Sequence, residues 1–286
     1  TSSSPRTTGP ELPSIVGTLT MNNVNGVILN ATTTAQKLTL TNGTLTTAST
    51  SALIIAGTNP SDVSEGSSTS YVKGPLIRTF PASLATGSTY SFPIGKTSYN
   101  PVGLVDLVTG AGNSIRIEAE VFEGSSGGSP GTGLSAVDNE LTALIAPRLP
   151  LDAAIQEAKM RWTKSGLGAG HRIGKSETVN GVYNSIGGTV SGNTITSDPF
   201  TSFSYFVLGI NTNTFSGAYT VGSSGANYTT ITGAINAMTA GGFTGPVVLS
   251  LQDASYSETF PIVLSQIAGS SATNTLTIKP ASSNVV

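Results

Sequence analysis

Apolar and polar side chains alternate along three stretches in the middle of the chain, the pattern of strands that bury one face and expose the other. The apolar positions are Ile115, Ile117, Ala119 and Val121; Ala158, Met160 and Trp162; and Phe203, Tyr205 and Val207. In the first two stretches the polar positions between them are Arg116, Glu118 and Glu120, and Lys159, Arg161 and Thr163. One buried and one solvated face predicts an antiparallel β-sandwich. Residues 151–159 also fit a short helix, and we favour a strand only for their second half.

A second pattern repeats near the N-terminus. Leu19–Met21 and Leu38–Leu40 lie 19 residues apart, and an Asn-containing turn follows each of them. Repeats of about 20 residues predict successive coils of a parallel β-solenoid, in which Asn and Thr stack on their counterparts in the next coil. The alternative is an antiparallel meander with a hairpin turn at Asn42 and Gly43.

The C-terminal stretch predicts one short helix followed by strands. Its apolar positions, Ile231, Ala234, Ile235 and Met238, have helical spacing. Asn227 or Thr229 is available to cap the first turn, and Gly241 and Gly242 to end the helix. Three runs rich in β-forming residues come next, at 247–251, 260–264 and 276–278.

Charge is distributed unevenly and suggests where one architecture gives way to another. Of the 28 Lys, Arg, Asp and Glu residues, 5 lie in residues 1–70 and 3 in residues 216–286, which leaves 20 between them. We therefore predict three domains: the end of a β-solenoid at 1–70, a β-sandwich-like module at 71–215, and the start of a second parallel β-helix at 216–286.

Composition excludes several classes of function. A formal net charge of −2 without a cluster of Lys and Arg argues against nucleic-acid binding. No apolar run reaches the roughly 18 residues that a membrane-spanning helix needs. The many Thr, Ser and Asn residues, the low charged fraction of 10% and the absence of Cys are typical of an extracellular bacterial β-protein. No signal peptide is visible, which fits a processed or excised segment.

Few motifs indicate chemistry. The sequence Gly174-Lys175-Ser176 is similar to the end of a phosphate-binding loop, but Ala169 occupies the position of the required first glycine; residues 95–97 fail in the same way. His171, the only histidine, lies in a Gly-rich segment and is expected to be a solvated loop residue. Glu118, Glu120 and Glu123 could pair as catalytic carboxylates, but a solvated, salt-bridged face is the simpler interpretation. We predict no catalytic, cofactor-binding or metal-binding residues.

Two kinds of ligand remain open. Structural calcium could use hard oxygen donors; the candidate donors are Asp62, Glu65, Asp138, Asp152, Asp253 and Glu258. A sugar platform could use Trp162 and the loop tyrosines Tyr99 and Tyr183. Because Trp162 alternates with Met160, core packing is the better interpretation for the tryptophan.

Several phrases resemble known families. YTTITGAINA at 228–237 and ASYSETFPI at 254–262 resemble the N-terminal edge of right-handed parallel β-helices of the pectin-lyase-like superfamily, in which a short helix caps the open end. Three phrases in the middle of the chain resemble a β-module of large surface and secreted Bacteroidota proteins exported by the type IX pathway, including gliding adhesins. They are SSTSYVKGPLIRTFPAS at 67–83, YSFPIGKTSYNPVGLVDL at 90–107 and TSFSYFVLG at 201–209.

The resemblance implies a non-catalytic structural or adhesive segment of a large extracellular surface protein. Its expected partners are other modules of the same long chain, surface glycans or neighbouring cells, and secretion machinery. The alternative is a carbohydrate-binding or accessory segment of a secreted polysaccharide-degrading β-helix enzyme. The C-terminal stretch supplies only Asp253, Glu258 and Lys279 as charged groups, so we expect no lyase or hydrolase activity from this chain.

Overall fold

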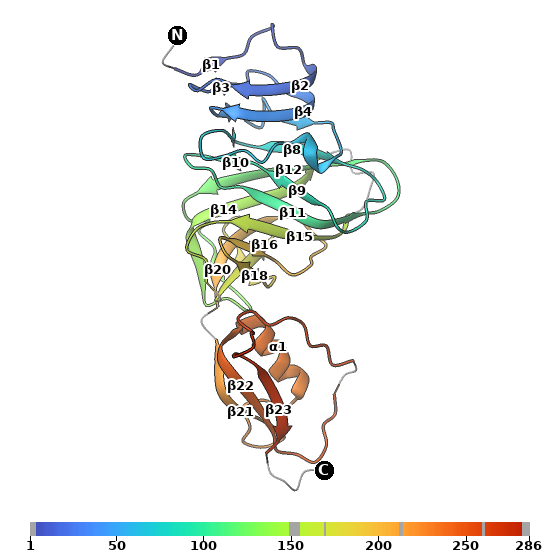
Figure 1. Ribbon diagram of the computed structural model, residues 1–286, viewed down its shortest axis with the longest axis vertical. Helices are drawn as coiled ribbons and strands as arrows, with labels where there is room; N and C mark the ends of the chain where they lie inside the picture. The colour runs from blue at the N-terminus through green and yellow to red at the C-terminus, as the bar shows by residue number, and fades with distance from the viewer. Residues whose placement is uncertain (1–3, 149–154, 169, 212–213, 259–260, 282–286) are drawn as a thin grey trace.

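The computed structural model describes residues 4–148, 155–168, 170–211, 214–258 and 261–281. Nearly all regular structure in these residues is β-strand, which confirms the all-β class. The molecule is elongated, with the first strands at one end of its long axis and the last strands at the other (Figure 1).

Two parallel sheets form the N-terminal end, and the chain passes back and forth between them. The short sheet contains β1 (Arg6–Thr7), β3 (Val27–Ile28), β5 (Leu45–Thr46), β7 (Val72–Lys73) and β10 (Ile94–Gly95). The larger sheet begins with β2 (Ile15–Asn22), β4 (Thr33–Asn42), β6 (Leu53–Ile55) and β8 (Leu76–Phe80). Each return to a sheet adds one parallel strand beside the last. We refer to residues 4–80 as the coils, and their assignment to a β-solenoid stays a prediction.

The repeat seen in the sequence sets the register of the first coils. Leu19 pairs with Leu38, and Met21 with Leu40, in a parallel ladder. The antiparallel meander is therefore wrong, and Gly43 does not close a hairpin. Gly43 has a φ of 78°, and a Cβ added there would lie 1.7 Å from the carbonyl oxygen of Asn23, so the turn leaving β4 requires glycine.

The large sheet continues without interruption into antiparallel strands. Beyond β8 it contains β12 (Ile115–Glu123), β14 (Ala136–Arg148), β20 (Tyr205–Ile210), β16 (His171–Ser176), β17 (Val182–Ser185) and β13 (Ser129–Pro130). A second, wholly antiparallel sheet has the order β18 (Thr189–Ser191), β19 (Thr194–Thr196), β15 (Ile155–Thr163), β11 (Val102–Thr109) and β9 (Thr89–Phe92). The strand favoured for the second half of 151–159 is confirmed from Ile155 onward, while 151–154 lie outside the described residues.

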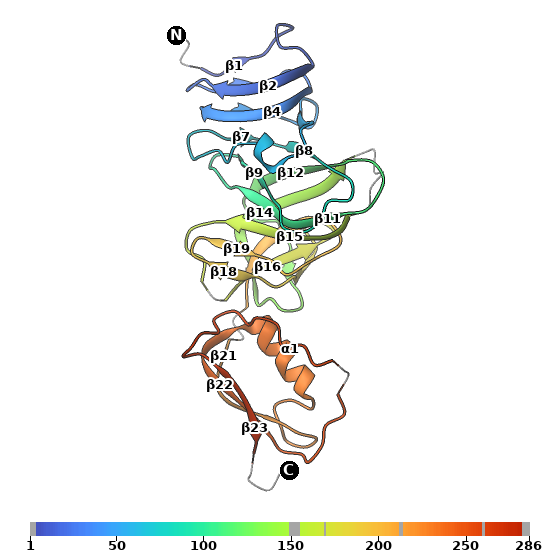
Figure 2. The same ribbon diagram turned by 45° about the vertical axis from the view of Figure 1, so that its right-hand side comes forward.

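Figure 2 shows strands of both sheets in the middle of the molecule. The two sheets pack on one hydrophobic core that also extends into the coils. The ring of Phe80 in the large sheet contacts that of Tyr90 in the second sheet at 4.7 Å between centroids. Trp162 and Met160 are fully buried in this core, as the alternation predicts, and Leu38 and Leu53 of the coils belong to the same cluster. The large sheet and the hydrophobic core both continue across residue 70. The domain boundary that the sequence suggested there stays a prediction.

A buried arginine ties the coils to the second sheet. The Nη1 of Arg78, on β8, donates to the Ser91 carbonyl at 2.7 Å. Its Nη2 donates to the carbonyls of Asn59 and Pro60, at 2.9 and 3.0 Å, where the 3₁₀ helix η1 (Pro60–Asp62) begins. Burial lowers the pKa of Arg78 to about 10, so the guanidinium remains charged at neutral pH.

Alternation predicted some faces correctly and others wrongly. Ile115, Ile117, Ala119 and Val121 are buried as expected. Glu118, however, is only 4% exposed, because β12 is a central strand and Glu118 lies between Ile77 and Ala146 on its neighbours. The alternation expected at 203, 205 and 207 is wrong, although Val207 itself is buried: β20 is central and buries Phe206, Val207 and Leu208 in succession.

The C-terminal end is a three-stranded parallel sheet with a helix packed on it. It contains β21 (Phe215–Val221), α1 (Ile231–Gly241), β22 (Phe243–Leu251) and β23 (Leu276–Pro280). The helix begins at a different cap from those expected, because the Thr230 hydroxyl accepts from the Gly233 N–H at 3.0 Å. Of the strand expected at 260–264, residue 260 lies outside the described residues and 261–264 are not a strand.

Candidate functional site

Neither glycine-lysine motif forms a phosphate-binding loop. Residues 174–176 lie within β16, where backbone N–H groups serve the sheet, and Lys175 Nζ pairs with Glu177 at 2.7 Å. Lys96 follows β10, and its Nζ pairs with Glu120 Oε1 at 2.5 Å. Both lysines therefore contact carboxylates.

His171 is the first residue of β16 and not a loop residue, so that prediction is wrong. Its half-buried ring accepts a hydrogen bond at Nδ1 from the Gly168 N–H at 2.9 Å. Nδ1 also lies 3.2 Å from the carbonyl oxygen of Gly168, so the ring is held against this residue. The strand starts at His171 because this residue pairs with Ile210 on β20.

The glutamates of β12 do not form a catalytic pair. Glu120 binds Lys96, whereas Glu118 is buried between neighbouring strands. Glu123 Oε1 accepts from the backbone N–H groups of Thr97 and Ser98, at 2.9 and 3.0 Å, and its other oxygen accepts from the Thr97 hydroxyl. Burial opposes the charge on Glu123, but these hydrogen bonds outweigh it and lower the pKa of the carboxyl.

The oxygen donors suggested for calcium do not meet at one place, and most have local protein partners. Asp62 accepts from the Asn59 N–H at 2.8 Å, Glu65 from the Ser91 hydroxyl at 2.9 Å and Asp253 from the Ser223 N–H at 2.6 Å, while Asp138 pairs with Lys164 at 2.6 Å. Asp152 lies outside the described residues. Among the residues that the structure describes, no three His, Cys, Asp or Glu side chains gather where they could hold a metal ion.

Glu258 serves the C-terminal helix. Its carboxylate accepts from the backbone N–H groups of Ile231 and Thr232, at 2.6 and 3.0 Å, and from the Thr232 hydroxyl at 2.6 Å. These donors, the hydroxyl first, lower the pKa of Glu258. A carboxylate at a helix N-terminus also meets the positive end of the helix dipole.

Of the three aromatic residues suggested for sugar binding, Tyr99 lines a cavity, whereas the other two are buried. Trp162 is buried in the core. Tyr183, expected in a loop, lies buried in β17, and its hydroxyl donates to the Val179 carbonyl at 2.7 Å. Tyr99 lies in the loop after β10 and is half-buried.

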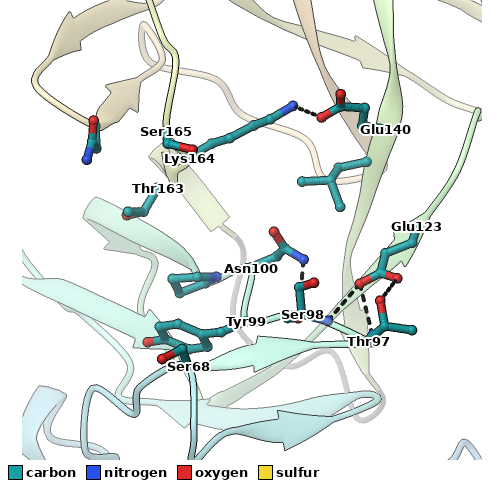
Figure 3. Close-up of a pocket in the computed structure, with 13 residues that line it drawn as sticks. Ser68, Thr97, Ser98, Tyr99, Asn100, Glu123, Glu140, Thr163, Lys164 and Ser165 are labelled. Atoms are coloured by element: carbon teal, nitrogen blue, oxygen red, sulfur yellow. Dashed lines mark hydrogen bonds and ion pairs between the residues drawn. The ribbon is translucent and has the colours of Figure 1, made fainter.

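Tyr99 lies in a groove of about 870 Å³, which Figure 3 shows from close by. Its walls come from the loop after β10, the neighbouring strands β12 and β14, and the turn after β15. The lining residues are Ser68, Thr97, Ser98, Tyr99, Asn100, Pro101, Glu123, Glu140, Leu141, Thr163, Lys164, Ser165 and Asn193. Sequence reasoning singled out Tyr99 and Glu123, but no local signal indicated that these separate segments meet.

The one lysine among the described residues that line the groove, Lys164, is held by two carboxylates. Lys164 Nζ contacts Asp138 Oδ2 and Glu140 Oε2, each at 2.6 Å. Burial disfavours the ammonium, but the two carboxylates outweigh this effect and raise the pKa of Lys164. Burial raises the pKa of Tyr99 to about 12, so its hydroxyl stays protonated at neutral pH.

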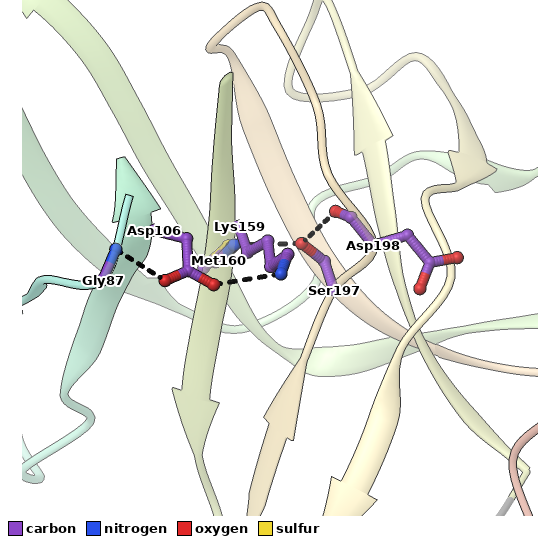
Figure 4. A network of polar contacts seen from close by, with 6 residues as sticks. All are labelled: Gly87, Asp106, Lys159, Met160, Ser197 and Asp198. Carbon is purple, nitrogen blue, oxygen red and sulfur yellow. Dashed lines mark hydrogen bonds and ion pairs between the residues drawn. The ribbon is translucent and has the colours of Figure 1, made fainter. Parts of the chain in front are cut away.

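A second polar network lies on the other sheet and has a structural role (Figure 4). Asp106 interrupts the register of β11 with a φ of 53°, a conformation that side chains other than glycine rarely adopt. Lys159 Nζ contacts Asp106 Oδ2 at 3.0 Å, and the Gly87 N–H donates to Oδ1 at 3.1 Å. The hydrogen bond from Lys159 is the largest cause of the lowered pKa of Asp106. This network stabilises a β-bulge.

No protein-family model, curated protein or solved structure matches this chain. The resemblances to pectin-lyase-like β-helices and to Bacteroidota surface modules therefore remain predictions. Among the described residues, no helix has the length and apolar character needed to cross a membrane.

Proposed function

We propose that this chain is a non-catalytic structural and adhesive segment of a large extracellular bacterial surface protein. In this proposal both ends are β-solenoid segments, and the protein belongs to the adhesin-type substrates of the type IX pathway in Bacteroidota. Its partners are other modules of the same long chain, together with glycans or cell surfaces.

One observation carries the proposal: the parallel coils join the antiparallel module edge to edge in a single ten-stranded sheet. Because β8 pairs with β6 on one side and β12 on the other, no flexible linker separates the coils from the module. A continuous sheet of this kind suits a rigid spacer. The carboxylates considered for catalysis or metal binding are also largely engaged by neighbouring protein groups, as a structural segment requires.

Surface display provides the test. Antibodies raised against the purified chain should label intact cells of the source organism, and brief protease treatment of the cells should remove the label. Labelling that requires permeabilised cells would overturn the proposal. Depolymerisation of a polysaccharide by the purified chain would overturn its non-catalytic part.

A further inference from the structure

The groove around Tyr99 contains an aromatic ring that is held in place before any ligand arrives. The Tyr99 hydroxyl donates to the Glu65 carbonyl, and the ring lies 5.7 Å from that of Tyr71 between centroids. The surrounding loop is anchored by Glu123, which accepts from two consecutive backbone N–H groups, and by the Asn100 N–H, which donates to the Ile94 carbonyl at 2.9 Å. A fixed aromatic surface loses little conformational entropy on binding.

The walls of the groove also carry polar side chains that make no hydrogen bond to the rest of the described protein. These are the hydroxyls of Ser68, Ser98, Thr163 and Ser165 and the side-chain amide of Asn193; within the described ranges none of them hydrogen-bonds to another protein group. Four hydroxyls and one amide supply both donors and acceptors. An aromatic face beside such groups matches a pyranose ring, which has apolar C–H faces and hydroxyls at its rim.

Charge decides between neutral and acidic sugars. The ammonium of Lys164 is already held by two carboxylates, Asp138 and Glu140, and a third carboxylate, Glu123, lies on the opposite wall. Among the described residues that line the groove, Glu123 and Glu140 carry negative charge and Lys164 carries positive charge, so the lining has a net charge of −1. A uronate or sulfated sugar would be repelled, whereas a neutral sugar would not.

We propose that this groove binds a neutral oligosaccharide, with one pyranose ring stacked on Tyr99 and hydroxyls elsewhere along the oligosaccharide bound by Asn193 and by the Ser and Thr residues of the lining. The inference specifies the ligand of the adhesive role proposed above, but its basis is the geometry of the groove. The proposed binding site is built by residues between 68 and 193, so neither the first strands nor the last strands of the molecule contribute to it.

Titration of the whole chain with neutral and acidic hexasaccharides tests the proposal. Cellohexaose, mannohexaose and β-1,4-galactohexaose serve as neutral probes and hexagalacturonate as the acidic probe, with binding followed by calorimetry and ligand-observed NMR. At least one neutral probe should bind, and hexagalacturonate should bind more weakly or not at all. Failure of every neutral probe at millimolar concentration, or preference for hexagalacturonate, would overturn the proposal.

Variants locate the site. Tyr99→Ala should weaken binding roughly tenfold or more by removing the stacking surface, whereas Tyr99→Phe should stay within a few-fold of the parent. Asn193→Ala, an exposed change that leaves the fold intact, should weaken binding several-fold, and its matched control, Asn30→Ala on an exposed turn of the coils, should not. Unchanged binding in both Tyr99→Ala and Asn193→Ala would overturn the assignment, with Trp162 fluorescence confirming that each variant is folded.

The two proposals fail in different ways. Surface labelling of intact cells without binding to any neutral probe would overturn the groove assignment alone. Binding that depends on Tyr99, in a protein that antibodies do not reach on intact cells, would overturn the surface role and leave the site in place.

Discussion

Parallel strands occur at both ends of the molecule, but the two ends are connected to the middle in different ways. The N-terminal coils share a sheet and a hydrophobic core with the antiparallel module. The C-terminal end has its own three-stranded sheet and its own core, built around Phe243, Val247 and Leu249. Parallel pairing alone therefore does not determine whether a segment unfolds together with its neighbour.

The two cores can be followed with separate signals. Trp162 is the only tryptophan of the chain and lies in the larger core, so its fluorescence reports on the coils and module together. The helix α1, the one α-helix in the part of the chain described, packs on the C-terminal sheet, so helical circular dichroism reports mainly on that end. We expect two transitions, one for each core.

The largest effect is expected from a cavity in the coils. Leu53→Ala removes a fully buried side chain from β6 and should destabilise the body that contains Trp162 by about 3 kcal/mol. Denaturant unfolding should show the loss in the fluorescence transition, although Leu53 lies in the coils. A fluorescence transition that does not move would show that the coils unfold independently.

The matched change at the other end is Leu249→Ala, which removes an equally buried leucine from β22. It should destabilise the C-terminal end by about 3 kcal/mol and shift the helical signal. The Trp162 transition should stay where it is. Movement of both signals together would mean that the two cores form one cooperative unit.

The next effect concerns the link between coils and module. Arg78→Met removes the donors to three carbonyls while keeping much of the side-chain volume, and should destabilise the larger body by about 2 kcal/mol. The fluorescence transition again measures it. Arg78→Lys, which retains a charge but not the planar fork, should recover only part of the loss.

A smaller effect is expected at the helix cap. Thr230→Ala removes the hydroxyl that accepts from the Gly233 N–H, and should destabilise the C-terminal end by about 1 kcal/mol. Thr229→Ala is the matched control, because Thr229 precedes the cap and makes no such bond within the described residues. Equal losses of stability in the two variants would contradict the capping role of Thr230.

The last effect is a dependence on alkaline pH. Burial raises the pKa of Tyr99 from the usual value of about 10 to about 12, so the folded protein favours the neutral phenol. The resulting stabilisation is fully present below pH 10 and is lost as the pH rises towards 12. Compared with Tyr99→Phe, the parent should therefore lose more stability across this range in the Trp162 transition. Parallel curves for the two proteins would contradict the assignment.

Periodic patterns in the sequence correctly predicted the elements that depend on residues close to one another in the chain. The spacing of Leu19 and Leu38 gave the parallel register, and the spacing of Ile231, Ala234 and Met238 gave the helix. These succeeded because each depends on periodicity within one segment.

Features that depend on distant neighbours were missed. Glu118 looked solvated because its own strand alternates, but flanking strands cover it. Glu258 contacts the start of a helix 27 residues earlier in the chain. The groove brings Tyr99, Glu140 and Asn193 together from three separate segments, and no local pattern encodes that meeting.

In Figure 1, β2, β4, β8 and β12 of the large sheet lie across the long axis of the molecule, so the hydrogen bonds between strands in this part of the sheet run roughly along that axis. Tension between the two ends would therefore pull these bonds apart and would not slide the strands past one another. Rupture would start at the edge strand β2 and advance one strand at a time, releasing slack with each step. Under load the large sheet would therefore lengthen in steps and dissipate mechanical energy at each step.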